Sequence, residues 1–407
     1  MGDLMSHVER MAERAALDLA GWVRVNGFAG YDPYDLPGYL FDRRCAGDPV
    51  SSNDETRLRE QDRVDPGGLR AELGLAPAVN AKALGLLLGA FSILHDGGLG
   101  DWTDEMALCV NWLDENAIPG FAGTGWGYPF NWESYQVIPA GTPTSVNSCH
   151  VGDGFRQRYL ATGDTVWLGR CQSVAEFLFS DLNEDHVSGR GRCYSYTPID
   201  FFHVHNANLG TAEFLVWTGL TCGREEFVLA GQDALAFTLS DLDDRGTLTY
   251  WARGFEPNEG LVGFMDHYHT AAELRSLLRL TRMLPEQSEV RAAFDRYFHY
   301  YLTEFFDDHS RPVLRPGFSW LPFDIHAGAE AAYILGESVH EHPAAKDRLV
   351  EFLPWFLSTC RNPDGSYLFR IEECEGKECA RTFPFLRWGQ AWTLRGLCAV
   401  LTGLRGI

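Results

Sequence analysis

The chain has 407 residues, of which 45% are hydrophobic and 22% are charged, so it can bury a large core and is not a disordered protein. Its 56 acidic side chains outnumber 34 basic ones, and the formal net charge of −22 excludes proteins that neutralise a nucleic-acid backbone or bind an anionic membrane surface. No apolar run is long enough to span a bilayer, and the amino terminus lacks the pattern of a signal peptide. We therefore predict a cytoplasmic protein with no transmembrane segment and no nucleic-acid partner.

The basic residues are unevenly divided between the two types. Only Lys82, Lys346 and Lys377 are lysines, and all the others are arginines. An acidic, lysine-poor composition is typical of proteins from halophile cells, and a GC-rich genome is the alternative cause. The halophile interpretation predicts that stability rises with salt, because ions screen the repulsion between carboxylates.

Helical segments of two kinds alternate along the chain. Residues 1–25 are expected to form an amphipathic helix, and the charged, turn-rich stretch 43–73 is a surface excursion or lid. Six segments that are apolar nearly all round begin at Ala78, Ser145, His203, Asp266, Asp324 and Arg387. Amphipathic segments with one apolar stripe lie between them and begin at Glu105, Asp164, Arg224, Ser288 and Ala344. The alternation predicts paired inner and outer helices.

The apolar segments recur at an even spacing. Markers taken one from each segment follow one another at steps of about 60 residues, namely Asn80, Asn147, Asn206, His267, His326 and Trp388. Six buried helices alternating with six half-solvated ones predict an all-α (α/α)6 toroid with an inner and an outer ring. Short β-like connections such as 247–251 join the pairs. We expect a single domain over 1–407.

The polar residues of the apolar segments gather at the amino-terminal ends. If the inner helices run parallel, these ends meet around one funnel. The polar members of the expected funnel are Asp32, Asn80, Asn147, His150, His203, His205, Asn206, Asn208, Asp266, His267, His269, Asp324, His326, Arg387 and Gln390. Its aromatic members are Tyr31, Tyr34, Trp126, Tyr128, Trp132 and Trp388. Each could instead be a helix cap or core filler, but six such helix starts in a row favour a binding site.

Aromatic rings beside hydrogen-bonding side chains suit sugar recognition, because a pyranose has an apolar C–H face and a rim of hydroxyls. Six helix amino termini add positive potential, which favours a carboxylate or phosphate. No metal or cofactor is predicted. The pairs His203/His205 and His267/His269 are spaced two apart and do not share a helix face, and no zinc or nucleotide motif is present.

Three functions are open for such a funnel. It is richer in Asn, His, Tyr and Arg than in acids, which favours proton abstraction beside a sugar carboxylate, by an epimerase or a lyase. The candidate proton carriers are His205, His267, His269 and His326, with Asp266 and Asp324 orienting them and Asn147, Asn206, Asn208 and Arg387 holding the sugar. The first alternative is a glycoside hydrolase whose two carboxylates are Asp266 and Asp324. The second is a non-catalytic glycan-binding assembly protein.

The repeat and several segments resemble known proteins. The inner-helix pattern resembles the six-hairpin glycosidase-like superfamily, which implies a carbohydrate substrate. The segments GYDPYDL, WGYPFNW, GTPTSVN, HNANL, FDIHA and RWGQAW are similar to a prokaryotic family from polysaccharide-biosynthesis and protein-glycosylation loci. Some of its members are labelled VpsJ-like and others, wrongly, aminolevulinate dehydratase. This resemblance implies a cytoplasmic role in assembling or editing a surface glycan, on a nucleotide-, lipid- or protein-linked precursor. Asn147 and His150 stand where the hydrolase branch would place an aspartate.

Overall fold

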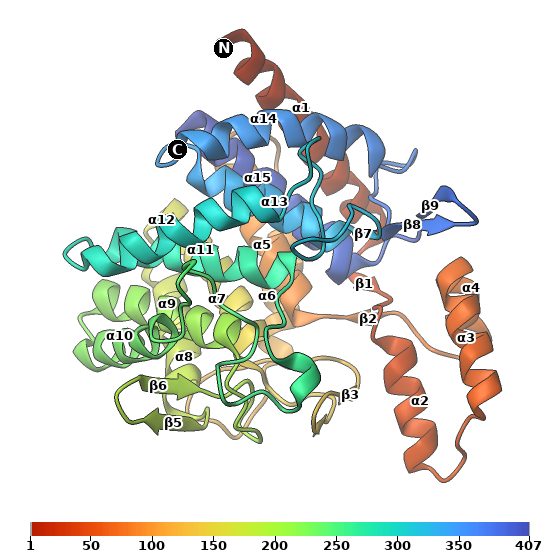
Figure 1. Ribbon diagram of the computed structural model, residues 1–407, viewed down its shortest axis with the longest axis horizontal. Helices are drawn as coiled ribbons and strands as arrows, with labels where there is room; N and C mark the ends of the chain where they lie inside the picture. The colour runs from red at the N-terminus through yellow and green to blue at the C-terminus, as the bar shows by residue number, and fades with distance from the viewer. Residues whose placement is uncertain (1, 407) are drawn as a thin grey trace.

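The computed structural model describes residues 2–406, and about half of them lie in an inner and an outer ring of helices, which Figure 1 labels. The inner ring consists of α5 (Ala81–Asp96), α7 (Ser145–Thr162), α9 (His205–Cys222), α11 (His267–Met283), α13 (Ile325–Ser338) and α15 (Trp392–Arg405). The outer ring consists of α1 (Gly2–Asn26), α6 (Thr103–Glu115), α8 (Thr165–Ser180), α10 (Glu225–Leu239), α12 (Ser288–Glu304) and α14 (Pro343–Thr359). Each inner helix packs on the next, and α15 packs on α5 to close the ring. The predicted (α/α)6 toroid is confirmed.

Four of the six inner helices begin with a polar side-chain cap, whereas α9 begins after Val204 without one. Asn80, Thr144, Asp266 and Asp324 each accept a hydrogen bond from a backbone N–H in the first turn of the helix that follows. The last inner helix begins differently, with a π-helical turn, η2 (Leu386–Ala391), that runs directly into α15. A wide turn of this kind is common at functional sites.

Glycines allow the inner helices to approach backbone to backbone. A Cβ atom on Gly85 of α5 would lie 2.5 Å from the carbonyl oxygen of His150 on α7, and one on Gly154 would lie 2.6 Å from the carbonyl oxygen of Gly85. Both contacts are far too short for a larger residue. The close approach brings the first turns of α5 and α7, with Lys82 and His150, to the same side of the ring.

Short antiparallel strands connect the helix pairs at the end of the ring where the inner helices start. They are β1 (Ala29–Gly30) with β2 (Ala78–Val79), β3 (Trp132–Glu133) with β4 (Val137–Ile138), β5 (Glu184–Val187) with β6 (Gly191–Tyr194), and the sheet β7 (Phe323–Asp324), β8 (Arg370–Cys374) and β9 (Lys377–Arg381). A 3-10 turn, η1, covers Glu259–Leu261. The expected β-like run 247–251 forms no strand; its Trp251 makes one bridge to Val204.

The stretch 43–73 lies in three helices that extend from one edge of the ring (Figure 1). They are α2 (Asp35–Cys45), α3 (Ser52–Val64) and α4 (Pro66–Glu72), and α3 has no buried residue. Arg70 joins them through ion pairs with Asp35 and Asp62, and Arg63 ties α3 to Glu372 of β8 at 2.8 Å. The position beside the ring agrees with a surface excursion; its action as a lid stays a prediction.

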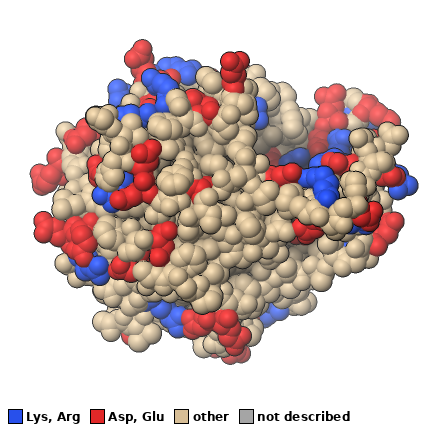
Figure 2. Space-filling model, turned by 90° about the horizontal axis from the view of Figure 1, so that it is seen from below, with Lys and Arg blue, Asp and Glu red and all other residues tan. Residues whose placement is uncertain are grey.

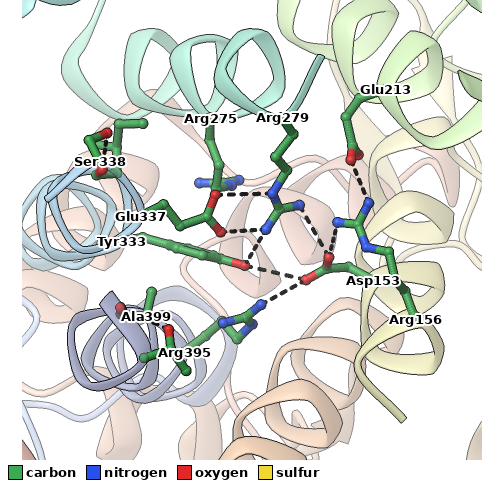
Figure 3. A network of polar contacts seen from close by, with 12 residues as sticks. Asp153, Arg156, Glu213, Arg275, Arg279, Tyr333, Glu337, Ser338, Arg395 and Ala399 are labelled. Atoms are coloured by element: carbon green, nitrogen blue, oxygen red, sulfur yellow. Dashed lines mark hydrogen bonds and ion pairs between the residues drawn. The ribbon is translucent and has the colours of Figure 1, made fainter. Parts of the chain in front are cut away.

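A network of charged side chains fills the axis of the ring (Figure 3). The Asp153 carboxylate of α7 accepts hydrogen bonds from Arg156, from Arg279 at 3.1 Å, from Arg395 at 3.2 Å and from the Tyr333 hydroxyl at 3.3 Å. Burial acts to raise the pKa of Asp153, but the three guanidinium groups outweigh it and hold that pKa well below its usual range. The network therefore connects α7, α11, α13 and α15 across the centre of the toroid.

The acidic excess lies on the outer surface. Figure 2 shows acidic side chains around the rim of the face seen from below, with fewer basic ones and a largely uncharged centre. None of the helices between residues 2 and 406 has the length and hydropathy that a bilayer crossing requires.

Candidate active site

A cavity of about 730 Å³ opens among the first turns of the inner helices. It is lined by Tyr34, Lys82, Tyr128, Phe130, Trp132, Val146, His150, Tyr196, Asn206, Tyr250, Tyr268, His269, Ala272, His326, Glu330, Arg387, Trp388 and Trp392. The aromatic rings and the hydrogen-bonding side chains thus come together at the expected end of the toroid. Of the predicted site residues, the cavity brings together Tyr34, Tyr128, Trp132, His150, Asn206, His269, His326, Arg387 and Trp388.

His326, in the first turn of α13, is enclosed by aromatic rings. Its ring stacks on Tyr268 with centroids 4.8 Å apart, and it meets the edge of Trp388 at 4.6 Å and the ring of Trp392 at 4.8 Å. Its Nδ1 atom is buried with no hydrogen-bond partner among the described residues. Burial, followed by the charges of Lys82 and Arg387, holds the pKa of His326 well below 6.5. The imidazole is therefore neutral at pH 7 and can accept a proton.

His269, in the first turn of α11, is held by an aspartate. Its Nδ1 atom lies 2.7 Å from Oδ2 of Asp266, whose Oδ1 accepts the backbone N–H of His269 at 3.0 Å. A hydrogen bond donated by Nδ1–H to the carboxylate leaves Nε2 as the nitrogen that takes up a proton. The His269 side chain is 26% exposed, and its ring contacts Tyr250 and Tyr268 with centroids 4.4 and 4.6 Å apart. The two hydrogen bonds to Asp266 therefore fix the orientation of the His269 ring.

Arg387, on the π-helical turn η2, is a cationic residue of the cavity wall. The Arg387 guanidinium donates from Nη2 to Asp32 at 2.7 Å and from Nε to the second oxygen of the same carboxylate. Its planar group lies 5.5 Å from the Tyr128 ring centroid and 5.2 Å from that of Trp388. Asp32 is not among the residues that line the cavity, and its carboxylate accepts both hydrogen bonds from Arg387.

Lys82, on the first turn of α5, is the cavity residue that sequence reasoning missed. Lys82 is 7% exposed, and its Nζ atom lies 4.9 Å from the centroid of the Trp392 ring. Burial, with the nearby charge of Arg387, lowers the pKa of Lys82 from 10.5 to about 7. One signal was present in the sequence, because Lys82 is one of three lysines and stands two residues after the first marker, Asn80.

The cavity contains one carboxylate among the described lining residues, Glu330 of α13. Glu330 accepts a hydrogen bond from Arg275 of α11. Burial raises the pKa of Glu330 although Arg275 acts to lower it. Five further rings were also missed at the sequence level, those of Phe130, Tyr196, Tyr250, Tyr268 and Trp392.

Three predicted histidines lie outside the cavity lining. His205 contacts Asp241 at 3.0 Å and Thr238 at 3.3 Å, and His203 contacts Asp185 at 3.0 Å and stacks on Phe255. Among the described residues, the His267 side chain has one hydrogen-bond partner, the Tyr301 hydroxyl at 3.3 Å, and its ring packs on Phe305 and Phe306 in a buried cluster. The pair His267/His269 is split because residues two apart on a helix face different sides, whereas His203 precedes α9 and neither it nor His205 lines the cavity. Within residues 2–406, no group of three or more His, Cys, Asp or Glu side chains is arranged to hold a metal ion.

The predicted Asn and Gln residues that do not line the cavity either hydrogen-bond to the backbone or have no partner among the described residues. Asn208 accepts from the N–H of Tyr194 at 3.0 Å and donates to the carbonyl of Ala234 at 2.8 Å. Gln390 makes two hydrogen bonds to the backbone of Tyr367, and Asn80 caps α5. Asn147 is fully buried with neither amide atom bonded to a described residue.

Two predicted aromatic residues also bond to the backbone. The Trp126 indole donates to the carbonyl of Leu113 at 2.9 Å, and the Tyr31 hydroxyl donates to the carbonyl of Leu75 at 3.3 Å. Both anchor connections between helices rather than the cavity wall.

The two predicted carboxylates line a groove of about 690 Å³ beside the cavity. The groove and the cavity share the rings of Tyr34, Tyr268 and Trp388. Asp324 is fully engaged there: it caps α13 and accepts from the Trp388 indole and from Arg370, both at 2.8 Å. Asp266 and Asp324 thus lie outside the cavity lining and bond to residues that line it, Asp266 to His269 and Asp324 to Trp388.

The ring closure and the position of the cavity define the chain as an (α/α)6 toroid protein. No family model and no curated protein matches the chain, but solved structures do. A cellobiose 2-epimerase from Bacillus thermoamylovorans matches with a TM-score of 0.61 at 8% identity, over 81% of this chain and 88% of that one. An α-mannanase of glycoside hydrolase family 76 from Bacteroides thetaiotaomicron matches with a TM-score of 0.59 at 12% identity, over 80% and 87%.

A glycosyl hydrolase family 88 protein from Bacteroides vulgatus matches with a TM-score of 0.53 at 15% identity, over 86% of this chain and 99% of that one. At these identities the likenesses establish the fold. The three structures are those of one sugar epimerase and two glycoside hydrolases. The narrower resemblance to the VpsJ-like family stays a prediction.

Proposed function

We propose that the protein is a carbohydrate-active enzyme that transfers a proton on a uronate of a surface or protein-linked glycan, or of its precursor, by epimerisation or elimination. The observation that carries the proposal is the pair His269 and His326. Both imidazoles line one aromatic cavity, and both contact the ring of Tyr268. An epimerase needs two such groups, one to remove the proton beside the carboxylate and one to return a proton to the opposite face.

The charges in the cavity support the same chemistry. Removing the proton beside a carboxylate places negative charge on the sugar, and Lys82 and Arg387 lie in the cavity wall where they can stabilise it. Loss of the neighbouring glycosidic oxygen from that intermediate makes the reaction an elimination, and reprotonation makes it an epimerisation. Burial raises the pKa of Tyr268 well above 10, so its hydroxyl keeps its proton and can donate a hydrogen bond.

A glycoside hydrolase is the second candidate, and one observation favours it. Asp266 and Asp324 line the same groove next to the cavity, as a pair of acid and base would. However, Asp324 is bonded to Arg370 and Trp388, and Asp266 to His269. The carboxylate pair is therefore less available than the imidazole pair.

Incubation with uronate oligosaccharides and with lipid-linked and surface glycans in deuterated water, followed by mass spectrometry, tests the proposal. Deuterium at a uronate carbon with unchanged chain length, or shortened chains with unsaturated ends, is the expected result. Its loss in the His269→Gln and His326→Gln variants, with His186→Gln on the exposed β5 strand as the control, would assign the imidazoles. Shortened chains with ordinary reducing ends would establish the hydrolase instead, and bound but unchanged glycans a binding protein.

A further inference from the structure

Lys82 is a buried cation without a counter-ion. Its Nζ atom makes no hydrogen bond or ion pair with any residue of the described chain, although a lysine is seldom buried unless it is paired. The other charged groups of the cavity wall are already matched, Arg387 by Asp32 and Glu330 by Arg275. Lys82 is therefore a basic group of the cavity wall to which no carboxylate of the described protein is bonded.

Three basic side chains meet around one tryptophan. The Trp392 ring lies 4.9 Å from Nζ of Lys82, and its centroid lies 4.8 Å from those of His150 and His326. Burial and then the charge of Lys82 hold the pKa of both histidines well below 6.5. This end of the cavity is thus neutral or cationic and contains no free acid among the residues that the structure describes.

We propose that Lys82 binds the anionic group of the substrate, a sugar carboxylate or phosphate, through its ammonium. The inference rests on the proposed function, because it takes the cavity to be the sugar site. A bound anion supplies the counter-ion that burial denies to Lys82, whereas a neutral sugar leaves the ammonium unpaired. Lys82 would then select acidic over neutral sugars.

Binding of an anion is coupled to protonation of the Lys82 amine. The groups that face Lys82 from the surrounding elements are Asp32, His150 on α7, Arg275 on α11, His326 and Glu330 on α13, and Arg387 on η2. With these groups around it, and burial as the largest cause, the pKa of Lys82 is about 7. A bound anion raises that pKa, so affinity is greatest below pH 7. It falls about tenfold per unit as the pH rises from 7 to the new pKa.

Nuclear magnetic resonance can observe Lys82 directly because the chain has only three lysines. In protein labelled with ¹³C-lysine, each ε-carbon reports the titration of its own amine. Lys346→Met and Lys377→Met identify two signals, which leaves that of Lys82 without changing the cavity. The expected result is one lysine that titrates near pH 7 and moves upward on addition of D-glucuronate. A Lys82 signal unmoved by D-glucuronate and by D-glucose 6-phosphate would overturn the proposal.

Binding measurements with matched variants complete the test. We expect Lys82→Met to weaken D-glucuronate binding about tenfold or more at pH 6 and to leave D-glucose binding within twofold. Lys82→Arg should keep the affinity and remove its pH dependence between 6 and 9, and the surface control Lys377→Met should behave like the wild type. A phosphate as the natural group is indicated if D-glucose 6-phosphate, and not D-glucuronate, depends on Lys82. Equal loss for D-glucose and both anions would refute the role.

The outcomes separate this inference from the proposed function. Lys82-dependent binding of an acidic sugar without deuterium exchange would keep the anion site and reject the proton transfer. Exchange on a uronate that Lys82→Met binds as well as the wild type would keep the proton transfer and reject the anion site.

Discussion

Replacement of Asp153 by asparagine tests the charged network at the axis of the toroid. The Asp153 side chain is 10% exposed and accepts from three guanidinium groups and one tyrosine hydroxyl. Asparagine has nearly the same shape, so the substitution removes the charge and part of the acceptor capacity without opening a cavity. The guanidinium groups then remain buried against a neutral amide.

The expected loss of unfolding free energy is about 4 kcal/mol, within the range of about 3–5 kcal/mol for breaking a buried ion pair. Arg156 and Arg279 keep second partners in Glu213 and Glu337, which limits the loss. Arg395 has no other carboxylate partner within residues 2–406, so its charge is left uncompensated. For 407 residues this corresponds to a fall in Tm of about 5 °C, from about 2.1 cal/mol/K of unfolding entropy per residue.

Urea-induced unfolding at pH 7 is the suitable assay, because urea is uncharged and does not screen the network. The matched control is Asp114→Asn, which breaks a surface pair with Arg170 in which the two side chains are 45% and 28% exposed. Exposed pairs contribute about 0–1 kcal/mol. If Asp153→Asn destabilises the protein no more than Asp114→Asn does, the network does not hold the inner ring together.

Three further expectations follow from the same structure. Burial lowers the pKa of His267 to about 3, so between about pH 6.5 and pH 3 the unfolded chain binds a proton at this residue and the folded protein does not. The free energy of unfolding therefore decreases as the pH is lowered through that range. His267→Phe should reduce this slope by about 1.4 kcal/mol per pH unit, measured by denaturation at a series of pH values between 6 and 4. Asp266→Asn, which can still cap α11, should lower the deuterium exchange rate about 10²-fold or more with little change in Tm; an unchanged rate would remove Asp266 as a positioning residue. Because the net charge is −22, Tm should rise between low and molar salt, and a flat Tm would reject the halophile interpretation.

The sequence predicted the rings well because helix period and capping are local properties. The even spacing of the markers and the polar starts at Asn80, Asp266 and Asp324 correspond to observed helix starts. The cavity also lies where parallel helix starts were expected to meet. Local hydrophobic patterns and caps decide where a helix begins, and these act within a few residues.

The inner helices were predicted to be apolar nearly all round, and that prediction left out the charged residues that two of them carry toward the axis. Asp153, Arg156, Arg275 and Arg279 are charged residues of α7 and α11 that point into the axis and have partners on other helices (Figure 3). Such pairs are separated by many residues in the chain. A single sequence therefore shows the charges but not that they match one another.

What the sequence by itself determined was the fold class and the gathering of aromatic and polar residue types around a cavity at the helix starts. Only the tertiary structure decided which of those residues face the cavity. His269 and His326 line it and His205 and His267 do not, because the rotation of each helix depends on its packing against its neighbours. Lys82 is left unpaired because Asp32 bonds to Arg387, 355 residues away in the chain, and no local pattern encodes that contact.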